Sequence, residues 1–230
     1  MREEVLRILR MVEEGKLNAQ EAERLLSALE TLRAPGAGVG ISFDRKPNAE
    51  FVEKELPGRD DFNLSLSASK AELFLWDEDR VKLEAWVGDL GFANETPSGL
   101  ALNMARARIH LPSGRSLRLD VSAGKAKGDI PAVANITCAA GKAELRGLRE
   151  GTVSCSAGKV EILLSPEPGP LSLEVNAGKI EILVPGERKM RIIREDINAG
   201  GVQIDGRIED PSAPPATIRC SAGKISIRKG

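Results

Sequence analysis

Residues 176–185, NAGKIEILVP, are the clearest copy of a short motif that recurs along most of the chain. Other copies open with SAGK, AAGK or NAGG, at Ser122, Ala139, Ser156, Asn198 and Ser221. Three degenerate copies come earlier and carry Ser69, Gly88 and Ala105 at the glycine position. Self-similarity of this kind, over roughly nine copies between about residue 64 and about residue 227, is typical of proteins built from stacked repeats.

Apolar and polar residues alternate on both sides of each motif glycine. The residues five, three and one before it, and two and four after it, are apolar in nearly every copy, with Glu195 and Gly128 as the exceptions. The residues between them are mostly Ser, Asn, Asp, Glu, Lys and Arg. A period of two predicts a strand, a bend at the glycine and a second strand, each buried on one face.

Two architectures fit this pattern. In a meander, Gly-Lys would form a tight hairpin turn, but the resulting sheet would leave one whole apolar face uncovered. In a solenoid, the glycine is a corner and each rung pairs in parallel with the next, so the two strands of a rung enclose the core. We therefore predict a mainly β fold, a parallel β-solenoid of roughly nine short rungs. The predicted structural corner residues are Gly88, Gly124, Gly141, Gly158, Gly178, Gly200 and Gly223.

The N-terminus is predicted to form a small α-helical hairpin. Residues 2–14 carry apolar side chains at helical spacing, Gly15 suits a helix stop, and Asn18 with Glu21 gives a capping-box pattern for a second helix. We expect a hairpin module over 1–33, a linker and lead-in over 34–60 and the solenoid over 61–230. Two short helices bury little by themselves, so their apolar stripe is a predicted interaction surface. It comprises Val5, Ile8, Leu9, Val12, Leu25, Leu26 and Leu29.

A charged stripe follows the corner. Lysines stand directly after the motif glycines at Lys125, Lys142, Lys159, Lys179 and Lys224. Glutamates such as Glu144, Glu161 and Glu181 come two residues later and form a parallel acidic stripe. We expect a solvated surface whose charges offset one another. The alternative is a track for an anionic polymer or for lipid headgroups.

The candidates for chemistry are few. Cys138, Cys155 and Cys220 all stand three residues before a motif glycine, where other rungs carry aliphatic side chains, so they are expected to be buried, reduced thiols. His110 is expected to be an ordinary surface residue. With one histidine and three cysteines, we predict no catalytic residues, no metal site and no cofactor. The alternative is a disulfide or a two-thiol metal site at Cys138 and Cys155, which are expected on adjacent rungs.

Composition and the ends of the chain bear on partners. The 33 Lys and Arg nearly balance the 34 Asp and Glu, which argues against a nucleic-acid partner. Insertions lie only opposite the glycine corner, at 165–170 and 209–215, so any binding loop is expected at this far corner. The last repeat, ISIRKG, is expected to leave an open strand edge that invites stacking. We therefore predict self-association or a protein partner, most simply as a homo-oligomer.

The first 16 residues are charged and amphipathic and resemble neither a signal peptide nor a membrane span. The expected localisation is cytoplasmic. Association with the cell surface or with a membrane is left open.

Two segments carry a family resemblance. MVEEGKLNAQEAERLLSALE (11–30) resembles the short SHOCT-like helical domain of bacterial LiaX/YvlB-like proteins. LFLWDEDRVKLEAWV (73–87), followed by the repeated SAGK motif, resembles the bacterial β-strand repeat family called "putative adhesin". The resemblance implies a non-enzymatic protein, linked in some members to the cell-envelope stress response.

We therefore expect a scaffold, sensor or interaction protein whose helical hairpin mediates self-association or partner docking. The alternative is a surface adhesin that binds through the far-corner loops or through Trp76 and Trp86. The third hypothesis is a hydrolase or lyase built on a solenoid.

Overall fold

The structure is a computed structural model, and it describes residues 49–230. The predicted helical hairpin and most of the predicted linker lie outside these residues. The described elements are β1 (Glu50–Pro57), β2 (Asp61–Trp76), β3 (Arg80–Thr96), β4 (Gly99–Pro112), β5 (Ser116–Asp129), β6 (Val133–Cys138), β7 (Lys142–Leu148), β8 (Glu150–Cys155), β9 (Lys159–Leu164), β10 (Leu171–Val175), β11 (Lys179–Val184), β12 (Arg191–Ile197), β13 (Gly201–Ile204), the 3-10 helix η1 (Gly206–Ile208), β14 (Pro215–Cys220) and β15 (Lys224–Lys229).

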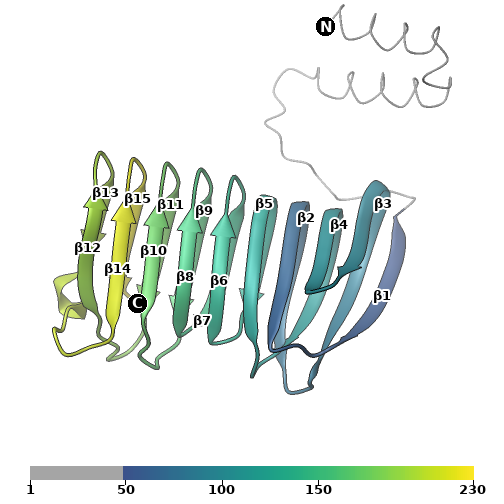
Figure 1. The fold of residues 1–230 in the computed structure, drawn as a ribbon, viewed down its shortest axis with the longest axis horizontal. Coiled ribbons are helices and arrows are strands. Elements are labelled where there is room, and N and C mark those ends of the chain that lie inside the picture. Colours follow the sequence, from purple (N-terminus) through teal and green to yellow (C-terminus); the bar gives the residue numbers. More distant parts are fainter. Residues whose placement is uncertain (1–48) are drawn as a thin grey trace, which may run out of the picture. The chain divides into compact units, whose positions relative to one another are not determined.

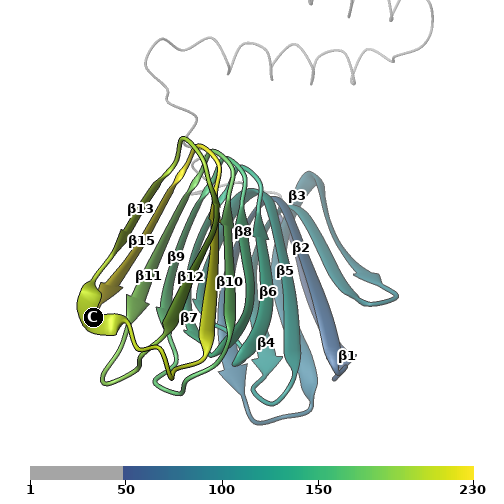
Figure 2. The ribbon, with the colours of Figure 1, turned by 60° about the vertical axis from the view of Figure 1, so that its left-hand side comes forward.

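The strands form the predicted parallel β-solenoid (Figure 1). Strands that precede the glycine make a first face, β14, β10, β8 and β6, and those that follow it make a second face, β7, β9, β11 and β15. The longer β2, β4 and β5 bend at the corner and run through both faces. Figure 2 shows the two faces diverging from the corner. The lead-in range also contributes a strand, because β1 pairs with β3 at the edge of the sheet.

Equivalent residues lie over one another because the parallel register is unshifted in the central rungs. Ile136, Val153 and Leu173 are in register on the first face, and Val160, Ile180 and Ile225 are in register on the second. All of them are buried, as the alternation predicts for these columns.

The corner residues must be glycine because there is no room for a side chain. A Cβ built on Gly158 would lie 2.4 Å from the Gly141 carbonyl oxygen and 2.6 Å from Cys138 Sγ. The same holds at Gly178, whose Cβ would lie 2.6 Å from the Gly158 oxygen. In addition, the amide of Lys159 donates to the Gly141 carbonyl at 3.0 Å. Each corner therefore rests directly on the backbone of the corner beside it.

One predicted inward column is wrong. The residue directly before the corner glycine was expected to be buried, but in the six complete copies of the motif it is exposed. The reason is that the chain turns through this residue and the glycine, so the alternation is interrupted there. These exposed residues are Ala123, Ala140, Ala157, Ala177, Ala199 and Ala222.

The order of the rungs also differs from the expected succession. β2 lies between β4 and β5, and β14 and β15 lie between the β10/β11 and β12/β13 rungs. The strand that contains ISIRKG, β15, is therefore inside the stack. The prediction that it leaves an open strand edge is wrong. The edge rung is β12/β13 instead. Parallel pairing permits this order because every rung presents the same kind of partner strand.

The edge rung contains a bulge. Between Glu195 and Ile197 the register shifts by one, and Asp196 has a positive φ of 45°. Glu195, expected in an inward column, is opposite Arg219 and binds its guanidinium at 2.8 Å. Arg194 takes the place opposite the buried Ile218. Bulges and charged side chains are features that protect sheet edges from pairing with other chains.

The N-terminal end is closed by an antiparallel hairpin. β3 pairs antiparallel with β4 on one side and with β1 on the other. Its corner differs from the repeat, because the register shifts between Val87 and Phe92, and Gly88 lies within this irregular segment. Leu90 and Phe92, expected in inward columns, are consequently 76% and 42% exposed.

A buried arginine ties the far-corner loops together. Arg188 is 4% exposed, and its guanidinium donates to the carbonyls of Ser165 and Arg149, both at 2.8 Å, and of Gly169 at 3.3 Å. Burial lowers the pKa of Arg188 to about 10, so the side chain stays charged at neutral pH. The sequence pattern gave no signal for this residue, since it stands in a loop between repeats.

The corner contact is tested by Gly158→Ala. The added methyl group would meet a backbone oxygen that has no room to move, so we expect a loss of roughly 2–3 kcal/mol in the free energy of unfolding, as for other overpacked sites. The control is Gly201→Ala, because nothing lies within 4 Å of a Cβ built there. Urea unfolding of both variants measures the difference. Equal losses would show that the corner does not depend on close backbone contact.

Candidate functional site

The aromatic side chains of the described chain gather at one end of the solenoid. All aromatic residues of the described chain lie between Phe51 and Phe92, within β1, β2 and β3. Phe62 is buried in the core, whereas Phe51 is 51% exposed and Phe74 38% exposed. Apart from Phe62, the Phe and Trp residues of 49–230 all lie outside the core.

Strand pairing brings these residues onto one outer surface. Trp86 of β3 lies beside Phe51 of β1, and their ring centroids are 5.3 Å apart. Phe74 of β2 lies beside His110 of β4, with the rings stacked at 5.2 Å. Trp76 completes the group at 5.3 Å from His110. We call Phe51, Phe74, Trp76, Trp86 and His110 the aromatic face.

Hydrogen bonds and cations hold the aromatic face in place. The indole Nε1 of Trp76 donates to the Arg80 carbonyl at 2.7 Å, and the Arg80 guanidinium lies 5.7 Å from the same ring. Arg108 lies 5.9 Å from the Trp86 ring. These contacts restrict the rings before any partner arrives.

Charges surround the aromatic face. Lys82 lies 2.9 Å from Glu53 and 3.2 Å from Glu84, and these carboxylates, Glu53 foremost, raise the pKa of Lys82. Arg108 lies 3.6 Å from Glu72. The arrangement of rigid rings within a polar rim can bind, but it offers no paired nucleophile and base. The single histidine stacks on aromatic rings.

The predicted charged stripe lies along the second face. Glu144 binds Lys142 and lies 2.9 Å from Lys125. These two lysines, Lys142 foremost, lower the pKa of Glu144 to about 2. Each glutamate therefore lies between lysines of successive rungs.

The pattern continues on the following rungs. Glu181 lies 2.8 Å from Lys179, 2.9 Å from Lys159 and 3.1 Å from Arg228. Its pKa is also lowered to about 2, by Lys179 and then Lys159. Lys159 additionally binds Glu161. Lys224 lies in register with Lys179 on the neighbouring rung.

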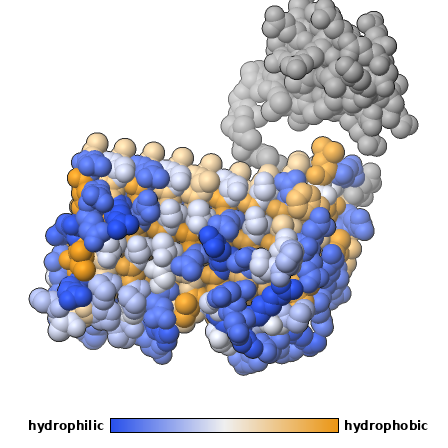
Figure 3. All heavy atoms as spheres, in the orientation of Figure 1, coloured by the Kyte–Doolittle hydropathy of each residue, from blue (hydrophilic) through white to orange (hydrophobic). Residues whose placement is uncertain are grey.

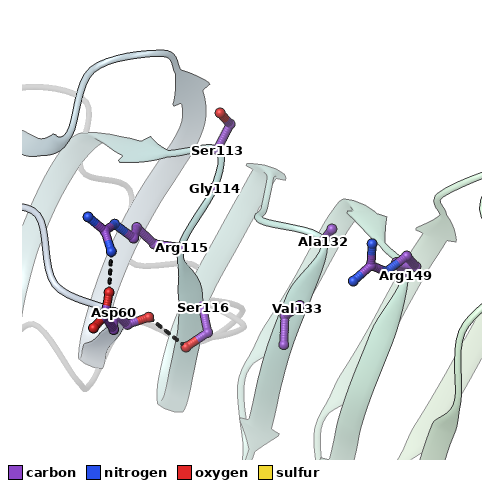
Figure 4. A pocket seen from close by; sticks show the side chains of 8 residues that line it. All are labelled: Asp60, Ser113, Gly114, Arg115, Ser116, Ala132, Val133 and Arg149. Carbon is purple, nitrogen blue, oxygen red and sulfur yellow. Dashed lines mark hydrogen bonds and ion pairs between the residues drawn. The ribbon is translucent and has the colours of Figure 1, made fainter.

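A shallow groove of about 470 Å³ lies near the far corner (Figure 4). On one side, Arg115 forms a bidentate pair with Asp79, at 2.8 and 2.9 Å, and also binds Asp60. This arginine ties together the connections that lead into β2, β3 and β5. On the other side, Arg149 pairs with Glu150 at 3.1 Å. The arginines of this groove are therefore engaged in structural contacts.

The cysteines are buried hydrophobic side chains, as the inward column predicts. Cys138 and Cys155 lie in register on adjacent rungs, Cys220 is two rungs further along, and all three are free thiols. Burial foremost, and then the neighbouring Cys155, raises the pKa of Cys138, which makes its reactive thiolate form scarcer. Among residues 49–230 no cluster of three metal-ligating side chains occurs.

The sequence indicated only part of this site. Trp76 and Trp86 were singled out, but Phe51 and Phe74 were not, and His110 was expected to be only an ordinary surface residue. The signal was the alternation itself, which places Phe74 and His110 on the outer side of their strands. The sequence could not show that these residues lie close together, because this depends on the rung order. β3 runs antiparallel, and β4 lies between β3 and β2. The predicted interaction residues of the helical hairpin lie outside the described residues.

Comparisons with known proteins give limited likenesses. A family model described as a SHOCT-like domain matches residues 3–34. No curated protein matches the chain. No helix among residues 49–230 has the length and apolar character needed to cross a membrane.

Two solved structures are similar to the chain. A "putative cell adhesion protein" from Clostridium sporogenes is 14% identical, with a TM-score of 0.49 over 80% of this chain and 100% of that one. A "putative adhesin" from Bacteroides fragilis is 10% identical, with a TM-score of 0.42 over 79% of this chain and 99% of that one.

The glutamates of the charged stripe predict a pH dependence. Because their folded-state pKa values near 2 lie below the ordinary 4.5, the pairs stabilise the folded state above about pH 4.5. This contribution is lost as the pH falls from about 4.5 towards 2. After solvent screening it amounts to less than about 1 kcal/mol per glutamate.

The test is Glu144→Gln combined with Glu181→Gln. Urea unfolding from pH 6 to pH 2 should show a flatter loss of stability than in the unchanged protein. Glu187→Gln, at an exposed glutamate of the far corner, serves as the control and should leave the slope unchanged. An equal slope in all three proteins would contradict the role of the paired stripe.

Proposed function

We propose that this protein is a non-enzymatic interaction protein in which the solenoid is a rigid platform and the aromatic face binds a protein partner. The observation that carries the proposal is the gathering of exposed and half-buried aromatic side chains on the outer surface of β1, β3, β4 and β2. Tryptophan and arginine are enriched in the residues that contribute most to protein interfaces.

The order within the aromatic face supports this role. The Trp76 ring is held by a hydrogen bond and by the Arg80 guanidinium, and the Trp86 ring lies beside the Arg108 guanidinium. Little side-chain freedom is therefore lost when a partner binds. The surrounding carboxylates and cations supply a polar rim. The sheet beneath is a continuous hydrogen-bonded platform that keeps these residues at fixed spacing.

The helical hairpin is proposed as a second interaction element, which mediates self-association or docks a regulatory partner. Its support is the match of residues 3–34 to the SHOCT-like domain and the apolar stripe that two short helices cannot bury alone. In this proposal the protein acts as a cytoplasmic scaffold or sensor. The resemblance to LiaX/YvlB-like proteins supports a link to the bacterial cell-envelope stress response.

The second candidate is a surface adhesin that binds through the far-corner loops. Arg188 favours it, because its guanidinium fixes the 165–170 loop by donating to the carbonyls of Ser165 and Gly169. The groove beside Arg115 gives such a ligand a place to bind.

Site-specific crosslinking in the source cells distinguishes the two candidates. A photoreactive residue at Phe51 should yield a discrete crosslinked protein, and the yield should fall by about tenfold in a background carrying Trp86→Ala and Phe74→Ser. The control is the same residue at Leu183, which is 41% exposed on β11 of the same surface. Crosslinking only from Pro166, in a far-corner loop, would favour the adhesin instead. No adduct from Phe51 or Pro166 would contradict both.

Self-association is tested by light scattering of the full chain. We expect an oligomer that Leu25→Asp with Leu29→Asp converts to the 24.7 kDa monomer, because two charges enter the apolar stripe. Gln20→Asp with Ser27→Asp adds the same charge at polar positions of the same predicted helix and should leave the mass unchanged. A monomeric unchanged protein would show that the hairpin does not associate with itself.

A further inference from the structure

The glycine corner forms a continuous edge with a distinctive composition. We define the corner edge as the residues from two before to one after the glycine position in each rung from β4 to β12/β13. No acidic residue occurs among these described segments. They are 103–106, 67–70, 122–125, 139–142, 156–159, 176–179, 221–224 and 198–201.

The crest of this edge is apolar. It consists of the exposed alanines that precede the corner glycines, seen as a pale row along the upper edge in Figure 3. At the β3 end larger side chains continue the row. Leu90 is 76% exposed, Phe92 is 42% exposed and Met104 is 36% exposed. Such side chains gain stability when an apolar medium covers them.

A row of cations runs beside the crest. It comprises Arg106, Lys70, Lys125, Lys142, Lys159, Lys179 and Lys224, one per rung. Neighbouring rungs of a sheet are about 4.8 Å apart, so the row is straight and dense. The acidic stripe offsets the lysines of β5, β7, β9 and β11 only in part, because three glutamates are shared among Lys125, Lys142, Lys159, Lys179 and Arg228.

From these features we propose that the corner edge binds a membrane surface rich in anionic lipids. The cation row would face the headgroups, where each Lys or Arg is attracted by the negative surface potential of the membrane. The crest would enter the boundary between headgroups and acyl chains, led by Leu90 and Phe92. Lysine suits this place because its aliphatic stem can lie against apolar groups while the ammonium stays among the phosphates.

A lipid surface fits better than a soluble polyanion. A polyanion would use the cations but would leave Leu90, Phe92 and Met104 in water. Stable attachment to a membrane needs two weak signals together, and the corner edge supplies both an apolar crest and a basic row. The rigid sheet also keeps the row straight, so many rungs can reach a flat surface at the same time.

Vesicle co-sedimentation of the full chain tests the proposal. The protein should bind vesicles of phosphatidylcholine with phosphatidylglycerol, bind pure phosphatidylcholine vesicles at least about tenfold more weakly, and dissociate in high salt. Ala140→Glu with Ala157→Glu should weaken binding by about tenfold or more, because it places two anions on the crest. Leu90→Ser with Phe92→Ser should also weaken it, without changing the charge.

The matched control is Thr137→Glu with Thr152→Glu. These exposed positions are on β6 and β8, the strands that lead into the same two corners, but on the outer surface of the first face. The control adds the same net charge and should bind within about twofold of the unchanged protein. The N-terminal segment is identical in every variant, so it cannot produce a difference between them.

Three results would overturn the proposal. The first is equal binding to charged and uncharged vesicles, and the second is an equal loss in the crest variant and the control. The third is binding to soluble polyphosphate that competes with the vesicles and is unaffected by Leu90→Ser with Phe92→Ser, which would assign the edge to a polyanion. None of these measurements involves the aromatic face, so their failure is distinct from failure of the proposed protein-binding function.

Discussion

The close contact between successive corners is the constraint on which the rest of the structure depends. Each corner glycine lies on the backbone of its neighbour, with no room for a Cβ at Gly141, Gly158 or Gly178. At most corners the residue is glycine because of this close contact and not because of its backbone conformation. Among the complete motifs only Gly124 has a positive φ. The contact sets the register of every rung. Inward columns then stack into one core, and outward columns stack into rows of like residues.

In the degenerate rungs the corner residue does not have to be glycine. Most of the aromatic face lies on these rungs. β2 and β4 turn the corner with Ala68 and Met104 at positive φ, so a side chain can occupy the glycine position. Ser69 fills that position in β2 and accepts a hydrogen bond from the Ala105 amide. These strands carry much of the aromatic face, whereas the regular rungs carry ion-paired rows and aliphatic residues.

The alternation around the motif glycine was enough to predict the solenoid, the buried cysteines and the core columns, because a period of two fixes which side of a strand is buried. It could not predict the rung order, since any permutation of similar rungs satisfies the same pattern. It also missed the exposed alanines, where a turn breaks the period, and the shift at Asp196, which depends on the strand being at an edge. Arg188 and the aromatic face depend on contacts between distant segments, which no local pattern contains.

The inserted position of β14 and β15 has a consequence for biogenesis. The ribosome makes β12 and β13 before the strands that separate them from β10 and β11. The edge rung cannot reach its final neighbours until residues 215–229 have emerged and threaded between the two pairs. Assembly of this end of the stack is therefore not a stepwise addition from the N-terminus, because β12 and β13 must wait for β14 and β15.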